Sequence, residues 1–229
     1  MARQAVTKRR RRAADNQAAE FLRVGQPISD TQVLAVLSLW RFRPNKARLN
    51  VIPDGQDFVS SDTIGLVCDR SGRVVVDSAT RKYPNLFRLL AAWLKQRRPT
   101  FLAMDFPFTN IPVNHSYAAK LHRDAHNAGV SLTKSFGDTF VGGQLTYWPN
   151  DDGRILLADL QDKDSVTVDT RSHYTLFDGR RAHRVERFSG GDRYSTVFFS
   201  VTPWANGPRD DLPAGVVYPS DYSLQYSIS

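Results

Sequence analysis

Cysteine is almost absent from this chain of 229 residues, in which Cys68 is the single example. One cysteine excludes an intramolecular disulfide, and we therefore expect a reducing, intracellular compartment. Long apolar runs are also lacking, since none approaches the length of a membrane span and the N-terminus has no apolar stretch typical of a secretory signal. We accordingly expect no membrane partner, and we treat the chain as a monomer.

The net positive charge is small outside the first 14 residues. The formal net charge is +8, of which Arg3 and the run Lys8–Arg12 carry +6, so that +2 is left for the 215 residues that follow the first 14. Residues 1–20 are polar and lack a core period, and we predict a disordered basic tail that the chemistry does not need. The run is typical of a nuclear-import signal or a nucleic-acid contact, and a transit peptide or a solvated arm without a specific role fits as well.

Residues 21–229 are predicted to form a single domain, and its first part mixes helix and strand signals. The apolar stretch 31–42 fits either a helix or a strand. Two β-branched runs, Thr63–Val67 and Arg73–Val76, flank turn residues and predict a β-hairpin. Leucines at helical spacing after a proline predict an amphipathic helix over residues 85–97.

The pattern changes after residue 101, where short strand-like runs alternate with turn clusters about every ten residues. This spacing favours a β-sandwich or a barrel over residues 101–204. Gly142 and Gly143 indicate a turn or a bulge and no phosphate cradle, because no helix follows them. We therefore predict a mainly β domain with flanking helices, followed by an irregular segment over residues 205–229.

One group of residues has the composition of a metal site. His122 and Asp124 are two positions apart, which places both side chains on one face of a strand. His183 follows a turn and is the natural third ligand. Two histidines and one carboxylate on one side of an ion form the facial triad of non-haem iron(II) oxygenases. A zinc hydrolase can use the same three ligands, and an H-x-D can also be a surface histidine beside an Arg–Asp pair.

A cationic residue follows the third ligand at a suggestive spacing. Arg193 lies ten residues after His183, across a tight turn, so a returning strand would bring it back toward the metal. A buried guanidinium needs a bidentate anionic partner, and the distal carboxylate of 2-oxoglutarate would supply one. Ser195 would face the same way and donate a hydrogen bond to that carboxylate. A zinc hydrolase has no evident need for this pair.

These motifs carry a family resemblance. The chain resembles the TET/JBP-like 2-oxoglutarate oxygenases of protists and algae between about residues 61 and 204. The segments that carry the resemblance are Asn114–Tyr117, His122–Ser131, Phe136–Asp138, Gly142–Trp148, Leu176–Phe188 and Arg193–Phe199.

The resemblance implies a double-stranded β-helix (jelly-roll) core and the oxidation of a C–H bond with Fe(II), 2-oxoglutarate and O2. The positions that match the family's iron ligands and its 2-oxoglutarate-binding pair are His122, Asp124 and His183, then Arg193 and Ser195. His126 and Asn127 match a His-Asn pair of the TET enzymes, in which the asparagine contacts a flipped pyrimidine. The chain lacks the cysteine-rich zinc region of animal TET proteins, which puts oxidation of methylcytosine in duplex DNA in doubt.

Several polar residues have two interpretations. Asn114 and Tyr117 could bind the cosubstrate from a neighbouring strand, or they could be buried polar groups that the backbone satisfies. Asn127 could instead shape a turn with Gly129. Structural or exposed positions are expected for His115 and His173, and packing is favoured over base stacking for Trp40, Trp93, Trp148 and Trp204.

The sequence leaves the substrate open. A 5-methylpyrimidine base in nucleic acid, which Asn127 would read and to which the basic N-terminal segment would bind, is the most specific hypothesis. A protein side chain or a small metabolite is the alternative for an oxygenase. The non-enzymatic alternative is an inactive jelly-roll binding module, which a broken triad would indicate; all three ligands are present.

Overall fold

The protein is described by a computed structural model that covers residues 2–97, 105–202, 206–208 and 213–216. The helices are α1 (Ala2–Val24), α2 (Asp30–Leu39), α3 (Ser78–Lys82) and α4 (Pro84–Gln96), with short 3-10 helices at Leu157–Asp159 and Asp162–Asp164. The strands are β1 (Pro44–Asn45), β2 (Val59–Cys68), β3 (Val74–Val76), β4 (Asn110–His115), β5 (Asn127–Phe136), β6 (Val141–Gly142), β7 (Leu145–Tyr147), β8 (Val166–Val168), β9 (Thr175–Phe177), β10 (His183–Val185), β11 (Phe188–Ser189) and β12 (Tyr194–Val201).

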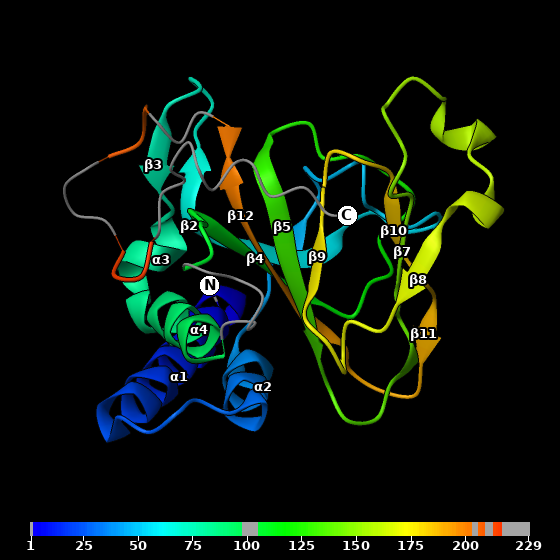
Figure 1. Ribbon diagram of the computed structural model, residues 1–229. Coiled ribbons are helices and arrows are strands. Elements are labelled where there is room, and N and C mark those ends of the chain that lie inside the picture. Colours follow the sequence, from blue (N-terminus) through cyan, green and yellow to red (C-terminus); the bar gives the residue numbers. More distant parts are fainter. Residues whose placement is uncertain (1, 98–104, 203–205, 209–212, 217–229) are drawn as a thin grey trace.

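Two antiparallel sheets form the body of the molecule. The larger sheet has the order β1-β2-β4-β12-β5-β9, with β3 paired to β2, and the smaller sheet has the order β10-β7-β8. The helices gather on one side of the larger sheet, and the smaller sheet lies on the other side (Figure 1). The fold is mainly β with flanking helices and a jelly-roll core, which confirms the predicted fold class.

Side-chain alternation along β12 assigns a different task to each face of the larger sheet. Tyr194 and Phe198 belong to the core that the sheet shares with the helices, whereas Ser195 and Val197 line a cavity on the opposite face. Successive side chains of a strand point to opposite faces, so a single strand serves both the core and the cavity. The site described below is built on the cavity face.

The structure confirms the predicted amphipathic helix and the predicted hairpin, and it decides between helix and strand for a third segment. Residues 31–39 of the stretch 31–42 lie in helix α2, whose start is fixed by a capping box between Ser29 and Gln32. Helix α4 matches the helix predicted over residues 85–97, and strands β2 and β3 form the predicted hairpin, with Leu66 opposite Val76.

The three tryptophans among the described residues lie in packed interiors, as favoured from the sequence. Trp93 is fully buried and contacts the rings of Phe136 and Phe198, and both Trp40 and Trp148 are buried as well. Trp204 lies outside the described residues, as does most of the irregular segment predicted over residues 205–229. No helix in the described part of the chain is both long and apolar enough to cross a membrane.

The prediction of a disordered basic tail over residues 1–20 is wrong, because residues 2–20 lie within helix α1. Ala14 and Ala18 are buried in the main core, where α1 packs against α4 and α2. Arg11 is 1% exposed, and its Nη2 lies 2.5 Å from Asp62 Oδ2. The composition misled the prediction because alanine and arginine favour helices without a strong apolar signal, and the partner of Arg11 is distant in sequence.

Candidate metal centre

His122 and His183 come from neighbouring segments that a backbone bridge joins. Each residue donates its N–H to the carbonyl of the other over 3.0 Å, and Asp124 N donates to Gly179 O over 2.8 Å. His183 is the first residue of β10, whereas residues 122–124 lie before β5 and pair only through His122. The strand that the sequence suggested for the H-x-D is therefore reduced to one bridge, which still brings the three side chains together.

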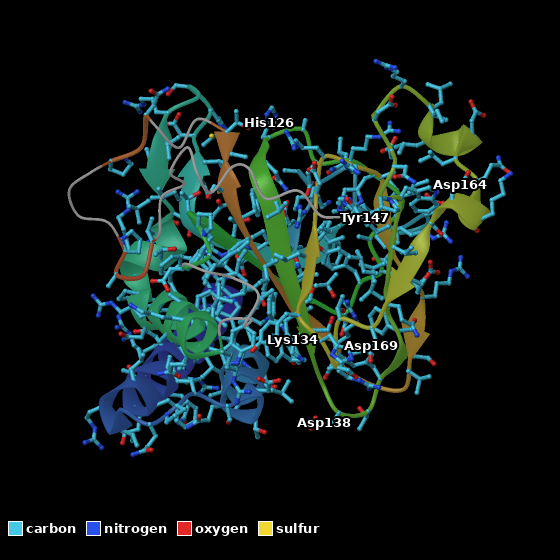
Figure 2. All side chains as sticks on the ribbon, viewed as in Figure 1. His126, Lys134, Asp138, Tyr147, Asp164 and Asp169 are labelled. Carbon is cyan, nitrogen blue, oxygen red and sulfur yellow. The ribbon has the colours of Figure 1, made fainter. Side chains whose placement is uncertain are left out.

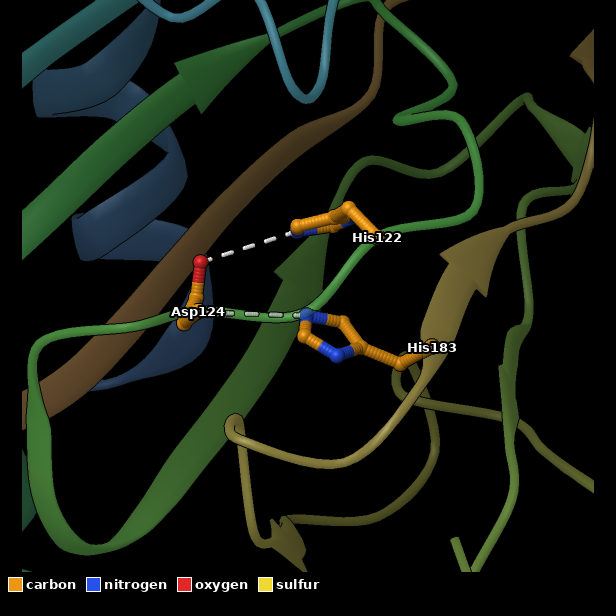
Figure 3. A group of neighbouring side chains, drawn as sticks. All are labelled: His122, Asp124 and His183. Carbon is orange, nitrogen blue, oxygen red and sulfur yellow. Dashed lines mark ion pairs between the residues drawn. The ribbon is translucent and has the colours of Figure 1, made fainter. Parts of the chain in front are cut away.

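The side chains of His122, Asp124 and His183 converge on one point (Figure 3). His122 Nε2 lies 3.7 Å from Asp124 Oδ1, and His183 Nε2 lies 3.9 Å from Asp124 Oδ2. These distances are too long for hydrogen bonds. One ligand atom from each residue lies within 4.8 Å of the other two, so a single ion can bind all three. The donor set, two imidazoles and one carboxylate, suits non-haem iron(II).

The same local contact orients both histidine rings. Nδ1 of His122 lies 2.7 Å from Lys120 O, and Nδ1 of His183 lies 2.8 Å from Arg181 O. A carbonyl oxygen accepts hydrogen bonds only, so each Nδ1 carries the proton and each Nε2 presents its lone pair. Both lone pairs therefore face the carboxylate of Asp124.

Burial keeps the two imidazoles neutral. Removal from water lowers the pKa of His122 to about 4, and the nearby His183 adds to this effect. Burial also lowers the pKa of His183. A metal ion binds the neutral form of imidazole, so both rings are ready to bind one at neutral pH.

Asn127 lies against the carboxylate of the triad. Its side chain is 5% exposed, and its Nδ2 donates to Asp124 Oδ2 over 3.1 Å and to Ser131 Oγ over 3.3 Å. The amide thereby orients Asp124, an interaction that the sequence did not suggest. Gly179 packs directly against this amide, since an added Cβ there would lie 2.5 Å from Asn127 Nδ2. His126, in the turn immediately before β5, is exposed (Figure 2) and lines the cavity.

Arg193 is the second charged feature of the site. It is 5% exposed, and its Nη2 donates to Ser135 Oγ over 2.7 Å. Its Nε is buried without a hydrogen-bond partner, and within the described parts of the chain no acidic side chain forms an ion pair with it. Burial lowers the pKa of Arg193 to about 10, which leaves it charged at neutral pH. A buried, unpaired guanidinium fits a carboxylate ligand such as the distal carboxylate of 2-oxoglutarate.

Gly143 makes room for this guanidinium. A Cβ on Gly143 would lie 2.7 Å from Arg193 Nε, and the backbone has a positive φ of 73° there. The rings of Phe140 and Phe188 lie 5.8 Å and 5.7 Å from the guanidinium carbon. The glycine pair that the sequence marked as a turn or bulge, of which Gly142 belongs to β6, therefore also shapes the anion site.

A polar network connects Ser195 to the rest of the cavity. Asn114 Nδ2 donates to Ser195 Oγ over 3.3 Å, and Tyr117 Oη donates to Asn114 Oδ1 over 2.8 Å. Arg48 Nη1 donates to the Oγ of Ser61 over 3.2 Å and to Tyr117 Oη over 3.3 Å. The side-chain polar groups of Asn114 and Tyr117 therefore form their hydrogen bonds with other side chains.

All of the proposed iron and cosubstrate residues line one cavity of about 640 Å³. Phe177, Val185 and Val197 add apolar surface to its wall. The sequence reasoning missed Arg48, which also lines the cavity and comes from the connection between β1 and β2. It also missed Ser135 and Thr170, which contact the guanidinium of Arg193. Single polar residues in loops and strands carry no pattern that could have identified them.

The two remaining histidines lie elsewhere. His115 Nε2 lies 2.8 Å from Asp192 Oδ1, and its ring stacks on Tyr194 at 4.6 Å. His173 is exposed in a turn. These positions agree with the structural or exposed roles expected for both.

Comparisons with known proteins give similarity in fold only. No family model matches the chain, and a search of curated proteins finds no match. A 2OG-Fe(II) oxygenase-family oxidoreductase from Burkholderia pseudomallei has 17% identity and a TM-score of 0.45, over 67% of this chain and 74% of that one. NgTET1 in complex with 5mC DNA has 16% identity and a TM-score of 0.41, over 62% of this chain and 60% of that one.

A prolyl hydroxylase from Trichoplax adhaerens, in complex with a hypoxia inducible factor oxygen degradation domain peptide fragment, is similar to the same degree. It has 14% identity and a TM-score of 0.41, over 82% of this chain and 78% of that chain. Likeness at this level does not distinguish among substrates. The functional proposal therefore depends on the side chains of the site.

Proposed function

We propose that the protein is an Fe(II)- and 2-oxoglutarate-dependent dioxygenase that hydroxylates a C–H bond and consumes O2. One observation supports this proposal above all. The His122–Asp124–His183 cluster shares a single cavity with Arg193, a buried guanidinium whose Nε has no partner. A metal triad and a buried cation that forms no ion pair among the described residues match the two ends of a bound 2-oxoglutarate.

Each residue of the site has a role in this proposal. His122, Asp124 and His183 would hold Fe(II), which supplies the oxygen-activating chemistry when bound. Arg193 binds the distal carboxylate through two N–H groups, and Ser195 adds a hydroxyl. The apolar part of the cavity wall excludes bulk water and strengthens these electrostatic contacts.

A metal-dependent hydrolase is the first alternative, because zinc also accepts two histidines and one carboxylate. A hydrolase does not explain why Arg193 is buried, since removing a charge from water without a partner costs free energy. An inactive binding module is the second alternative. It is disfavoured because His122, Asp124 and His183 all remain in place and converge.

For the substrate, we propose a 5-methylpyrimidine base, with a protein side chain or a small metabolite as the alternative. His126 supports the base, because it is an exposed polar side chain that lines the cavity. Asn127 supports it less than the sequence suggested, since its Nδ2 already binds Asp124 and Ser131. Its amide oxygen remains the group that could contact a base.

For a nucleic-acid partner, the proposed contact is the basic part of α1, where Lys8, Arg9 and Arg12 are exposed. Helix α1 packs on the face of the larger sheet opposite the cavity. It would therefore attach nucleic acid to the protein without guiding a base into the site.

The test is succinate production by the purified protein with Fe(II), ascorbate and 2-oxoglutarate, across methylated oligonucleotides, peptides and metabolites. We expect succinate from wild type and none from His183→Ala. Turnover of a substrate under anaerobic conditions without 2-oxoglutarate would instead support the hydrolase. In the oligonucleotide arm, mass spectrometry should detect an oxidised 5-methylpyrimidine, and an unchanged base alongside turnover of a peptide or metabolite would overturn the nucleobase proposal alone.

A further inference from the structure

Arg123 lies between two of the proposed iron ligands, yet its guanidinium pairs with Asp151. Arg123 Nε lies 2.6 Å from Asp151 Oδ2 and Arg123 Nη2 lies 2.7 Å from Oδ1, so the contact is bidentate. The Asp151 side chain is fully buried, and Arg123 Nη2 also donates to Ile155 O over 2.8 Å. A bidentate pair of this kind fixes orientation as well as distance.

The same carboxylate reaches the segment that carries the third ligand. Ala182, which immediately precedes His183, donates its N–H to Asp151 Oδ2 over 2.6 Å. Gly153 N donates to Asp151 Oδ1 over 3.1 Å, which fixes the carboxylate in its own loop. One buried side chain therefore connects the residue between His122 and Asp124 to the residue before His183.

We propose that Arg123 and Asp151 are a positioning pair that holds the two ligand-bearing segments at the separation that iron binding requires. This inference rests on the proposed function, because it assigns the pair to the same metal centre. Besides this pair, backbone hydrogen bonds join the two segments: the His122–His183 bridge, the bond from Asp124 N to Gly179 O and the bond from Val185 N to Ala119 O. The Arg123–Asp151 pair adds side-chain contacts to these backbone bonds.

Charge and burial agree with this role. The hydrogen bonds from Arg123 lower the pKa of Asp151, so the pair is ionic at neutral pH. Removing one member leaves a buried charge without its partner, and the two segments can then move apart. Metal affinity should suffer first, because all three ligand atoms must reach one ion, and such supporting contacts typically contribute about 10- to 100-fold to metal affinity.

A second Arg–Asp pair provides a matched control. Arg11 Nη2 lies 2.5 Å from Asp62 Oδ2, the arginine is 1% exposed, and the pair connects α1 to β2 without contact with any proposed ligand. Arg11→Gln should therefore cost stability as Arg123→Gln does, but it should leave the metal site unchanged. This contrast separates a positioning role from a purely structural one.

The experiment measures Fe(II) affinity by anaerobic calorimetry on the full apo chain, with unfolding followed separately in urea. We expect Arg123→Gln and Asp151→Asn to bind Fe(II) at least about 10-fold more weakly than wild type. Arg123→Lys, which keeps the charge but loses the planar fork, should give an intermediate affinity. Arg11→Gln should be destabilised and should bind Fe(II) as wild type does.

The positioning role is overturned if folded Arg123→Gln binds Fe(II) with wild-type affinity, and the proposed function then stands because wild type still binds the ion. If Arg123→Gln does not fold, Arg123→Lys and Asp151→Asn decide the question by the same criterion. Failure of wild type to bind Fe(II) would overturn the proposed function together with this inference.

Discussion

Single residues determine how the histidine rings of the metal centre are oriented and how the guanidinium of Arg193 is buried. The histidines face Asp124 because each Nδ1 binds a carbonyl oxygen two residues earlier, at Lys120 and at Arg181. Arg193 lies in the same cavity, and its buried Nε has no hydrogen-bond partner in the part of the chain that the structure describes. At the residue scale, the cavity therefore contains a cluster of imidazole and carboxylate donors together with the buried guanidinium of Arg193.

Arg193 should contribute more to cosubstrate binding than Ser195. Arg193→Lys keeps the charge but loses the fork, and we expect 2-oxoglutarate binding to weaken by roughly 1.5–3 kcal/mol. Ser195→Ala removes one neutral hydrogen bond and should cost about 1 kcal/mol. Calorimetric titration of 2-oxoglutarate into Fe(II)-loaded protein without oxygen measures both. Unchanged affinity in Arg193→Ala would refute the anchoring role.

Gly143 should be required for the same anion site. Gly143→Ala places a Cβ about where the Arg193 side chain lies, at a φ of 73° that L residues rarely adopt. We expect weaker 2-oxoglutarate binding together with lower stability. Gly153→Ala is the control, because Gly153 has a φ of 83° but no atom within 4 Å of the added Cβ. Equal effects of the two variants on 2-oxoglutarate affinity would contradict this account of Gly143.

The residues that the sequence identified share a local pattern, and those it missed do not. His122 and Asp124 are two positions apart, and Arg193 follows a turn, so spacing alone suggested a site. Arg48 contacts Tyr117 across 69 sequence positions, and Thr170 lies 23 positions before Arg193. Contacts of this length follow from strand order, which no spacing rule contains. The Asn127 contact with Asp124 is short-range, but an amide equally suits a turn or a substrate.

At the scale of elements, helix α1 shows why composition can mislead. Its buried stripe contains two small alanines and two charged residues, Arg11 and Asp15. Asp62 on β2 compensates the burial of Arg11, and Asn85 on α4 binds Asp15. Neither residue type is counted as an apolar anchor, so the segment resembles a polar tail. The strongly periodic helix α4 and the hairpin of β2 and β3 carry apolar or β-branched patterns, and these were predictable.

Deletion of residues 1–20 should therefore destabilise the protein. The truncation uncovers the core around α4 and leaves Asp62 without Arg11, and loss of that pair alone should cost about 3 kcal/mol. Urea unfolding of the full chain and of the truncated chain gives the difference. Lys8→Ala serves as a control, because Lys8 is exposed. A truncated chain as stable as the full one would mean that α1 is dispensable.

The Arg123–Asp151 pair should make a contribution to stability that depends on pH. Arg123 holds the pKa of Asp151 below its ordinary value, so the stabilisation is complete above about pH 4 and is lost as the pH falls through the lowered pKa. Arg123→Gln should consequently be less stable than wild type at pH 7, and the difference should shrink toward pH 2. Urea unfolding at both pH values measures it. A difference that stays constant with pH would show that the pair is not ionic.

At the scale of the whole molecule, the two faces of the larger sheet have different roles: one forms the main core and the other forms the proposed site. One face packs against the helices, and the other faces the cavity and the smaller sheet. The mainly β class and the flanking helices were predictable from alternating runs and turn spacing. The pairing order β1-β2-β4-β12-β5-β9 was not, because β12 inserts between β4 and β5 from a distant part of the chain.

We infer that the triad and Arg193 form one site for Fe(II) and 2-oxoglutarate. Anaerobic calorimetry of 2-oxoglutarate, with and without Fe(II), tests it most directly. The account predicts tight binding to the Fe(II)-loaded wild type, much weaker binding to the metal-free protein and to His183→Ala, and weakened binding to Arg193→Ala. Binding of equal strength with and without Fe(II), or no binding to the loaded wild type, would contradict it.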